Sequence, residues 1–216
     1  DGKLHKGETV YYEVVGFTTS GAPIMGDADN KKLNDKEFVK QYGKTTTFSY
    51  GCSPTGKKTM YGRDDQGNFE IETAVPQSDI YVYRMTMTNE DGDVVEYTPD
   101  FMRYRCEQMG VKTVPVFARF IIPEFYQLPD DVGSLQAVDA GEYVRKIAED
   151  FYDGPDPIGK THVREGVVVR IINRPKFCAY KHKNFSFKVL EGIIKADAVA
   201  PDMEEAQDVA EENGEE

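Results

Sequence analysis

Hydrophobic residues in the last third of the chain form two short segments that predict neighbouring β-strands. The first segment, residues 167–169, is a continuous run of three valines, and such a β-branched run is typical of a strand buried on both faces. The second segment, residues 177–183, follows an Asn-Arg-Pro turn. Because side chains alternate along a strand, Lys181 and Lys183 are expected to project from the same face.

The residues around these two strands have the chemistry of an anion site. Glu165 stands at the entry of the first strand, and Gly166 is expected to leave the backbone open to a ligand. Two ammonium groups, from Lys181 and Lys183, suit an anionic ligand. A nearby carboxylate suits a divalent metal that bridges the oxygens of that ligand.

Similar patterns along the rest of the chain predict a mixed organisation of helices and strands. Gly43 and Gly110 are placed to end two of the helices. An Asp-Gly turn at residues 91–92 predicts a β-hairpin after the strand at 80–88. The expected helices are residues 29–41, 99–109 and 140–152, and further expected strands are residues 45–51, 68–74 and 114–122.

The negative charge of the chain is concentrated at its end. The net charge is −12, but the last twenty residues hold nine acidic and no basic side chains, so the remainder carries only −3. That end has too little apolar content to pack and is expected to be disordered. Basic residues cluster elsewhere, at Lys57–Lys58, at Arg103 with Arg105, and from Arg164 to Lys188, and the last cluster is the expected phosphate-contacting surface.

Cysteine usage and hydropathy agree with a cytoplasmic protein. The three cysteines are widely spaced and form neither a disulfide framework nor a zinc pattern, so reduced thiols are expected. No segment reaches the ~18 apolar residues of a membrane span. No membrane partner is therefore expected.

The segment from Arg164 to Gly192, REGVVVRIINRPKFCAYKHKNFSFKVLEG, resembles motifs IV and V of the covalent nucleotidyltransferases. This superfamily contains ATP-dependent RNA ligases, DNA ligases and mRNA capping enzymes, and KHKNFSFK looks most like the RNA ligase branch. Upstream, GETVYYEVVGFTTSGAPIMG resembles motif III with Glu13 at the motif position, although the family often has Gly-Glu where this chain has Tyr12-Glu13.

A further segment, DIYVYRMTMTNEDGDVVEYT, resembles motif IIIa, whose aromatic residue stacks on adenine in family members. Tyr83 is the expected stacking residue, and Tyr81 is the second choice. The alternative is an ordinary hairpin in which both tyrosines only pack.

Motif I of the superfamily, a lysine in a Lys-x-Asp-Gly or Lys-x-His-Gly context that becomes covalently adenylylated, does not occur in this sequence. Asp1-Gly2 is too close to the motif III segment to be the tail of that motif. We therefore expect the chain to be the C-terminal portion of the domain, with its N-terminal part missing.

The resemblance implies an α+β fold, a nucleotidyltransferase (ATP-grasp-like ligase) domain of mainly antiparallel sheets with flanking helices. Residues 1–195 are expected to form this partial adenylyltransferase domain and residues 196–216 an acidic disordered tail. The implied function is an ATP-dependent RNA ligase of RNA repair. A lysine takes AMP from ATP, AMP passes to an RNA 5′-phosphate, and a 3′-hydroxyl then displaces it.

The resemblance also implies roles for individual residues. Glu13 would contact the ribose or the metal, and Tyr83 would stack on adenine. Glu165 would support Mg²⁺, while Lys181 and Lys183 would hold the phosphates and offset charge in the transition state. ATP, Mg²⁺ and RNA ends are the expected cofactors and partners, and a monomer is expected.

Two alternatives remain open. DNA ligases and capping enzymes share these motifs, but they usually continue past motif V into an OB-fold, and only about twenty acidic residues follow Gly192 here. The chain is alternatively a noncatalytic nucleotide- or RNA-binding module without the nucleophilic lysine.

Overall fold

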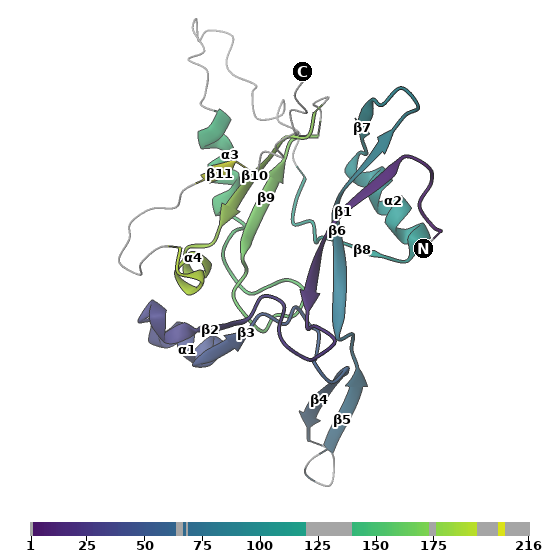
Figure 1. Cartoon of the computed structure of the whole chain (residues 1–216). Helices are drawn as coiled ribbons and strands as arrows, with labels where there is room; N and C mark the ends of the chain where they lie inside the picture. The colour runs from purple at the N-terminus through teal and green to yellow at the C-terminus, as the bar shows by residue number, and fades with distance from the viewer. Residues whose placement is uncertain are drawn as a thin grey trace, which may run out of the picture.

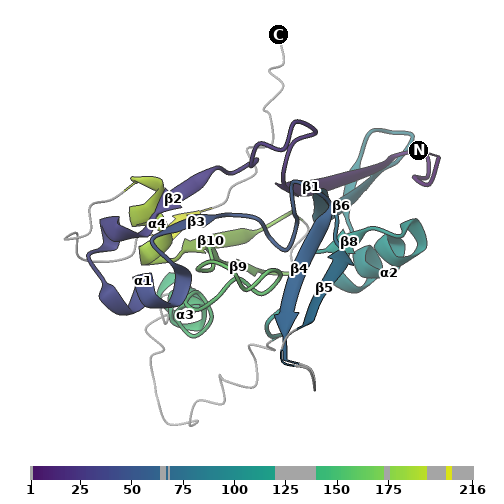
Figure 2. The same ribbon diagram turned by 90° about the horizontal axis from the view of Figure 1, so that it is seen from below.

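The computed structural model describes residues 2–63, 67, 69–119, 140–172, 176–193 and 203–205. This part of the chain is α+β, with four α-helices and several small, mainly antiparallel sheets. One sheet is centred on β1 (Glu8–Gly16) and β6 (Ser78–Thr88), and another on β9 (Gly166–Arg170) and β10 (Ala179–Lys183). These two sheets lie beside each other in the middle of the molecule (Figures 1 and 2). The predicted α+β class is therefore correct.

The first sheet is covered on one face by α2 (Pro99–Met109), which has the bounds that the sequence predicts. Thr98 caps its first turn, and Gly110 ends it in the left-handed conformation at φ +70°. Val82 and Met85 of β6 pack against this helix. Two short strands, β7 (Val94–Glu96) and β8 (Lys112–Thr113), extend the sheet on β6.

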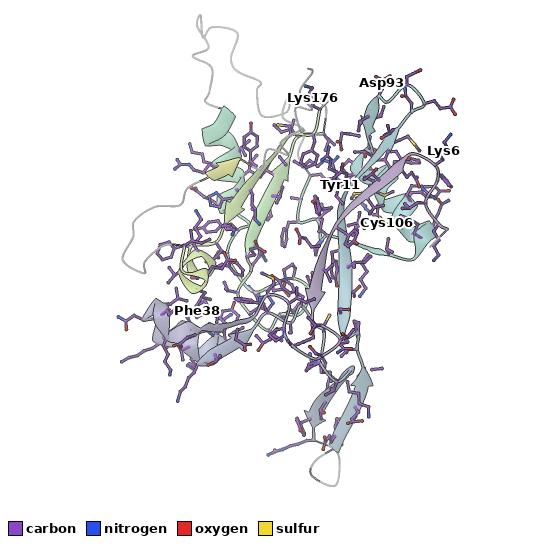
Figure 3. The ribbon with its side chains drawn as sticks, in the orientation of Figure 1. Lys6, Tyr11, Phe38, Asp93, Cys106 and Lys176 are labelled. Carbon is purple, nitrogen blue, oxygen red and sulfur yellow. The ribbon has the colours of Figure 1, made fainter. Side chains whose placement is uncertain are left out.

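The other face of this sheet belongs to a second core. Val15 of β1 and Tyr81 of β6 pack in one cluster with Phe187 and Leu190 of α4 (Phe185–Glu191). The first sheet is thus held between α2 and the elements around β9 and β10. Figure 3 shows the same division, with Cys106 of α2 and Phe38 on opposite sides of the molecule.

The residues between β1 and β6 form two small hairpin-like units. One joins β2 (Asp27–Asp29) and β3 (Thr45–Thr47) through a 3₁₀ turn, η1 (Asn30–Leu33), and a helix, α1 (Lys36–Tyr42). The other pairs β4 (Lys57–Gly62) with β5 (Phe69–Ala74) and projects away from the rest of the molecule (Figure 1).

The predicted helix at 29–41 is wrong in its extent. Asn34 adopts a left-handed conformation at φ +53°, and the Asp35 side chain caps a new helix by accepting from the amides of Glu37 and Phe38. The segment is therefore split into η1 and α1. Gly43 ends α1, as the sequence predicts.

Three strand predictions also need correction. The expected strand at 45–51 ends at Thr47, and Tyr50 has a left-handed conformation at φ +47°. Of the expected strand at 114–122, residues 114–119 are not in a strand, and residues 120–122 lie outside the described residues. Val168 of β9 is 56% exposed, so β9 is not buried on both faces. The face of β9 that Val168 shares with Lys181 is accessible to solvent, which a run of valines does not reveal.

The remaining elements flank the second sheet. α3 (Ala140–Glu149) ends three residues before the predicted boundary, and its contacts are with β9 and β10. Within the predicted acidic tail, the structure describes only β11 (Met203–Glu205), which pairs antiparallel with Tyr180–His182. The rest of that tail lies outside the described residues.

The basic residues Arg103 and Arg105, close together in the sequence, have different environments in the structure. Arg105 is buried, and its guanidinium donates to both carboxylate oxygens of Glu8 at 2.7 Å. Arg103 pairs instead with Asp100 on the exposed side of α2. The sequence could not separate these two arginines, because Glu8 is far from them along the chain.

Candidate functional site

The site is centred on the antiparallel pair of β9 and β10. Lys181 lies opposite Val168, and Lys183 lies opposite Gly166. Glu165 immediately precedes β9, and its carbonyl accepts a hydrogen bond of 2.8 Å from the amide of Asn184, just after β10. This backbone bond holds Glu165 at the end of β10 that carries the two lysines.

The side chains of Lys181 and Glu165 meet across the strand pair. The Lys181 Nζ lies 2.7 Å from Glu165 Oε1, and the two side chains are 37% and 31% exposed. An ammonium–carboxylate contact this short is a charge-assisted hydrogen bond. Because both groups remain open to solvent, an incoming anion or cation can reach them.

Lys183 has a carboxylate partner that the sequence did not suggest. Its Nζ lies 3.0 Å from Oε2 of Glu191, the last residue of α4. The helix is oriented for this contact by Asn184, whose side chain accepts from the Phe187 amide and caps the first turn. A cap residue at Asn184 predicts that a helix starts directly after β10, but it does not predict the direction of that helix, so the sequence carries no signal for the Lys183–Glu191 contact.

His182, between the two lysines, points away from them. Its ring is buried and packs edge-on against Tyr152, with ring centroids 4.8 Å apart. Burial lowers the pKa of His182, so the ring is neutral near pH 7. Regular alternation along β10 therefore places Lys181 and Lys183 on one face, as the sequence predicts.

Gly166 lies where the backbone leaves no room for a side chain. Its φ is +154°, and a Cβ there would collide with the carbonyl oxygen of His182 and lie 2.7 Å from the Lys183 Cα. The predicted close approach is therefore to β10 rather than to a ligand. It lets Glu165 and Lys181 sit on closely paired strands.

Glu13 lies on the neighbouring sheet and faces the same region. It is exposed and stands opposite Tyr81, whose side chain belongs to the core shared with α4. Burial, and then the charges of Glu165, Asp156, Glu191 and Glu13, raise the pKa of the Tyr50 hydroxyl. The structure thus brings Glu13 into the surroundings of Glu165 and Glu191, although no hydrogen bond joins Glu13 to either within the described residues.

The two candidate stacking residues differ sharply in environment. Tyr81 is buried in the core, whereas Tyr83 is only partly buried. On β1, Tyr11 pairs with Arg84 and Tyr12 with Val82, so Tyr83 is the extra residue of a β-bulge. A bulge re-aims a side chain, and the Tyr83 ring lies 6.4 Å from the ring of Tyr11.

Arg170 at the end of β9 links the two sheets at this bulge. Its guanidinium donates to the Tyr83 carbonyl at 3.4 Å and to the Tyr97 carbonyl at 3.1 Å. The ring of Phe177 lies between the guanidinium groups of Arg170 and Arg84, at 5.0 and 4.5 Å. Arg170 follows the valine run directly, yet nothing in its local pattern indicates this bridging position.

A small cavity of ≈ 50 Å³ lies at this junction, at the C-terminal end of β9. Tyr11 and Lys176 mark this end of the molecule in Figure 3. The lining residues are Glu96, Tyr97, Thr98, Pro99, Arg170, Ile171, Ile172, Lys176 and Phe177. The cavity does not include Glu13, Glu165 or the two lysines.

Among the carboxylates near the two lysines, Glu165 is the one that the sequence predicts as the metal-supporting residue. Among the described residues, no group of three or more His, Cys, Asp or Glu side chains is arranged to hold a metal. Mg²⁺ commonly binds through one or two carboxylates together with substrate phosphates. Glu165 therefore fits Mg²⁺ that arrives with a nucleotide.

Comparison with known proteins adds nothing to this geometry, because no protein family, curated protein or solved structure matches the chain. In the described ranges, no helix is both long and apolar enough to cross a membrane.

Proposed function

We propose that this chain is the nucleotide- and metal-binding part of an ATP-dependent RNA ligase that joins RNA 5′-phosphate and 3′-hydroxyl ends. The observation that carries the proposal is the 2.7 Å contact between Lys181 and Glu165 on the face that also carries Lys183. This face presents a carboxylate for Mg²⁺ and two ammonium groups for phosphates. The motif resemblance assigns the same roles to the same residues.

The Lys181–Glu165 pair is suited to exchange partners when a nucleotide binds. Without an anion, the ammonium and the carboxylate neutralise each other. A phosphate oxygen competes for Lys181, while the metal that accompanies the phosphates competes for Glu165. Nucleotide binding therefore replaces the Lys181–Glu165 ion pair by two contacts in a partly desolvated site, one between Lys181 and a phosphate oxygen and one between Glu165 and the metal.

The two ends of β9 would bind different parts of the nucleotide. The Tyr83 carbonyl accepts from Arg170 at one end, and Glu165 precedes Gly166 at the other, five residues or about 17 Å from Arg170 along the strand. An extended nucleotide can bridge this separation, with the adenine at Tyr83 and the phosphates at the lysines. In this arrangement Glu13, on β1 next to β6, contacts the ribose or the metal.

RNA would approach the same face. In the basic segment from Arg164 to Lys188, Lys188 is buried and Arg170 donates to backbone carbonyls, so the lysines of β10 supply the basic groups of this face. Phosphate contacts of this kind give affinity without sequence specificity. This agrees with an enzyme that recognises RNA ends.

The missing Lys-x-Asp-Gly or Lys-x-His-Gly context favours a second candidate, a noncatalytic nucleotide- or RNA-binding module. Both candidates require nucleotide binding at the β9–β10 face. They differ in the covalent step, which needs a lysine nucleophile in a suitable environment.

Isothermal titration calorimetry with ATP and Mg²⁺ tests the shared requirement. The chain should bind ATP saturably, and Lys181→Ala or Lys183→Ala should each weaken binding by at least about tenfold, as expected for a lost charge-assisted contact. Lys40→Ala is the matched control, because Lys40 is an exposed lysine on α1. Absence of ATP binding, or equal affinity in all four proteins, would refute the proposal.

A further inference from the structure

Tyr50 occupies an unusual backbone conformation next to the proposed site. It lies between β3 and β4 with φ +47°, a left-handed conformation that is rare for a large side chain. The following residue, Gly51, is pressed against Gly159, where an added Cβ would lie 2.5 Å from the Gly51 nitrogen. Strained residues of this kind persist where the surroundings hold them, and they gather at functional sites.

The ring of Tyr50 is fixed at the meeting point of three segments of the site. It is 9% exposed and packs edge-on against the buried ring of His162, with centroids 4.6 Å apart. The core cluster that contains it also contains one residue within two positions of each of Glu13, Glu165 and Glu191. These residues are Val15, Val163 and Leu190.

The hydroxyl of Tyr50 has a different environment from its ring. The described residues offer it no hydrogen bond, and its oxygen is not among the buried polar atoms that lack a partner. The hydroxyl is therefore not fully enclosed, and the charges of Glu165, Asp156, Glu191 and Glu13 act on it. Burial and these carboxylates raise its pKa, so it remains a protonated donor at neutral pH.

We propose that the Tyr50 hydroxyl is a ligand-binding group of the nucleotide site and donates a hydrogen bond to an oxygen of the bound nucleotide. This inference rests on the proposed function. A purely structural Tyr50 would need only its ring, because nothing in the described part of the chain uses the hydroxyl. The acceptor belongs either to the ribose or to a phosphate.

Calorimetric titration of Tyr50→Phe with ATP and Mg²⁺ tests this role, because the substitution keeps the ring and removes only the donor. We expect affinity about tenfold weaker than in the unmodified protein, the usual scale for a hydrogen bond to a charged or strongly polar ligand. Tyr97→Phe is the matched control. It removes a hydroxyl that donates to Glu8 at 3.0 Å in the other core, and it should leave ATP affinity unchanged.

Shorter ligands identify the acceptor. If the acceptor is a ribose oxygen, the ratio of affinities between the unmodified protein and Tyr50→Phe should stay constant from ATP through AMP to adenosine. If it is a phosphate oxygen, the ratio should fall to one for adenosine. Ratios of one for every ligand that binds would overturn the inference and leave the proposed function intact.

A spectroscopic measurement makes the test independent of the variant's stability. In protein labelled with 3-fluorotyrosine, the ¹⁹F resonance lost in Tyr50→Phe is that of Tyr50, and ATP with Mg²⁺ should shift it. An unmoved Tyr50 resonance at saturating ATP would also overturn the inference. Failure of the unmodified protein to bind ATP at all would overturn both the inference and the proposed function.

Discussion

The ammonium nitrogen of Lys181 lies 2.7 Å from Oε1 of Glu165, on the strand pair where β9 and β10 run antiparallel. Glu165 competes with phosphate for Lys181, and Lys181 competes with the metal for Glu165. The carboxylate occupies the position at which Lys181 would meet a phosphate, and the ammonium repels a cation from Glu165. Metal and nucleotide are therefore expected to bind together more readily than either binds alone.

Glu165→Gln should separate the effect of Glu165 on phosphate binding by Lys181 from its effect on metal binding. Without the carboxylate, Lys181 is available to phosphate, so ATP should bind this variant in EDTA about tenfold more tightly than it binds the unmodified protein. Mg²⁺ should strengthen ATP binding to the unmodified protein much more than to the variant. Calorimetry in EDTA and in Mg²⁺ measures both, with the exposed Glu37→Gln as control. Equal Mg²⁺ dependence in the variant and the unmodified protein would argue against Glu165 as the metal-supporting residue.

The chain should not become covalently labelled by α-³²P-ATP. No lysine stands in the Lys-x-Asp-Gly or Lys-x-His-Gly context that the reaction uses in the family that the chain resembles. The measurement is a denaturing gel after incubation with labelled ATP and Mg²⁺. A labelled band would identify another lysine as nucleophile, and peptide mapping would locate it.

Substitutions of Tyr83 should distinguish stacking from hydroxyl chemistry. Tyr83→Ala should weaken ATP binding by ~1–3 kcal/mol, the range for a lost base–aromatic stack. Tyr83→Phe keeps the ring and should have little effect. Tyr12→Ala, an exposed tyrosine on the adjoining strand, is the control. A Tyr83→Phe variant as weak as Tyr83→Ala would exclude stacking as the contribution of this residue.

The buried Glu8 should make folding stability depend on pH. Its hydrogen bond with Arg105 is the main reason why the pKa of this carboxyl falls from 4.5 to about 2 in the folded protein. Because the folded-state pKa is the lower one, the stabilisation is present above pH 4.5 and is lost as the pH falls toward 2. The shift corresponds to about 3 kcal/mol of unfolding free energy.

Urea unfolding of the unmodified protein and of Glu8→Gln between pH 7 and pH 2 measures this contribution. At pH 7 the variant should be less stable by several kcal/mol, because Arg105 is left buried without its carboxylate. The difference between the two proteins should shrink as the pH falls below 4.5. A difference that stays constant over this range would show that the ion pair does not titrate as the structure implies.

Gly166→Ala should be far more damaging than Gly92→Ala, although both glycines have positive φ. The new methyl group would collide with the His182 carbonyl and force β9 away from β10, so a loss of at least about 2 kcal/mol of unfolding free energy is expected. Gly92→Ala is the control, since Gly92 has φ +90° and no atom within 4 Å of the added Cβ. It should cost only about 1 kcal/mol of backbone strain. Urea midpoints compare the two, and similar losses would contradict the tight approach at Gly166.

Local patterns predicted those parts of the fold whose causes are local. The helix at 99–109 begins at a proline after a capping threonine and ends at a glycine, and the structure reproduces these bounds. The prediction of a strand at 114–122 was wrong, because it rested on apolar residues, which do not determine whether a segment pairs with another strand. Residues 112–113 pair with β6 and the Val114 amide donates to the Val82 carbonyl at 3.0 Å, but residues 115–119 run on outside any strand.

For the candidate site, alternation along one strand was enough to predict that Lys181 and Lys183 share a face, and the order of residues put Glu165 at the start of the adjacent strand. Three relationships came only from the three-dimensional structure: Glu191 is the partner of Lys183, the β-bulge in β6 falls at Tyr83, and Tyr50 shares a core cluster with Val15, Val163 and Leu190. These relationships join segments that are far apart along the chain or depend on the register between two strands. They are set by packing and strand register, which the periodicity of a single segment does not encode.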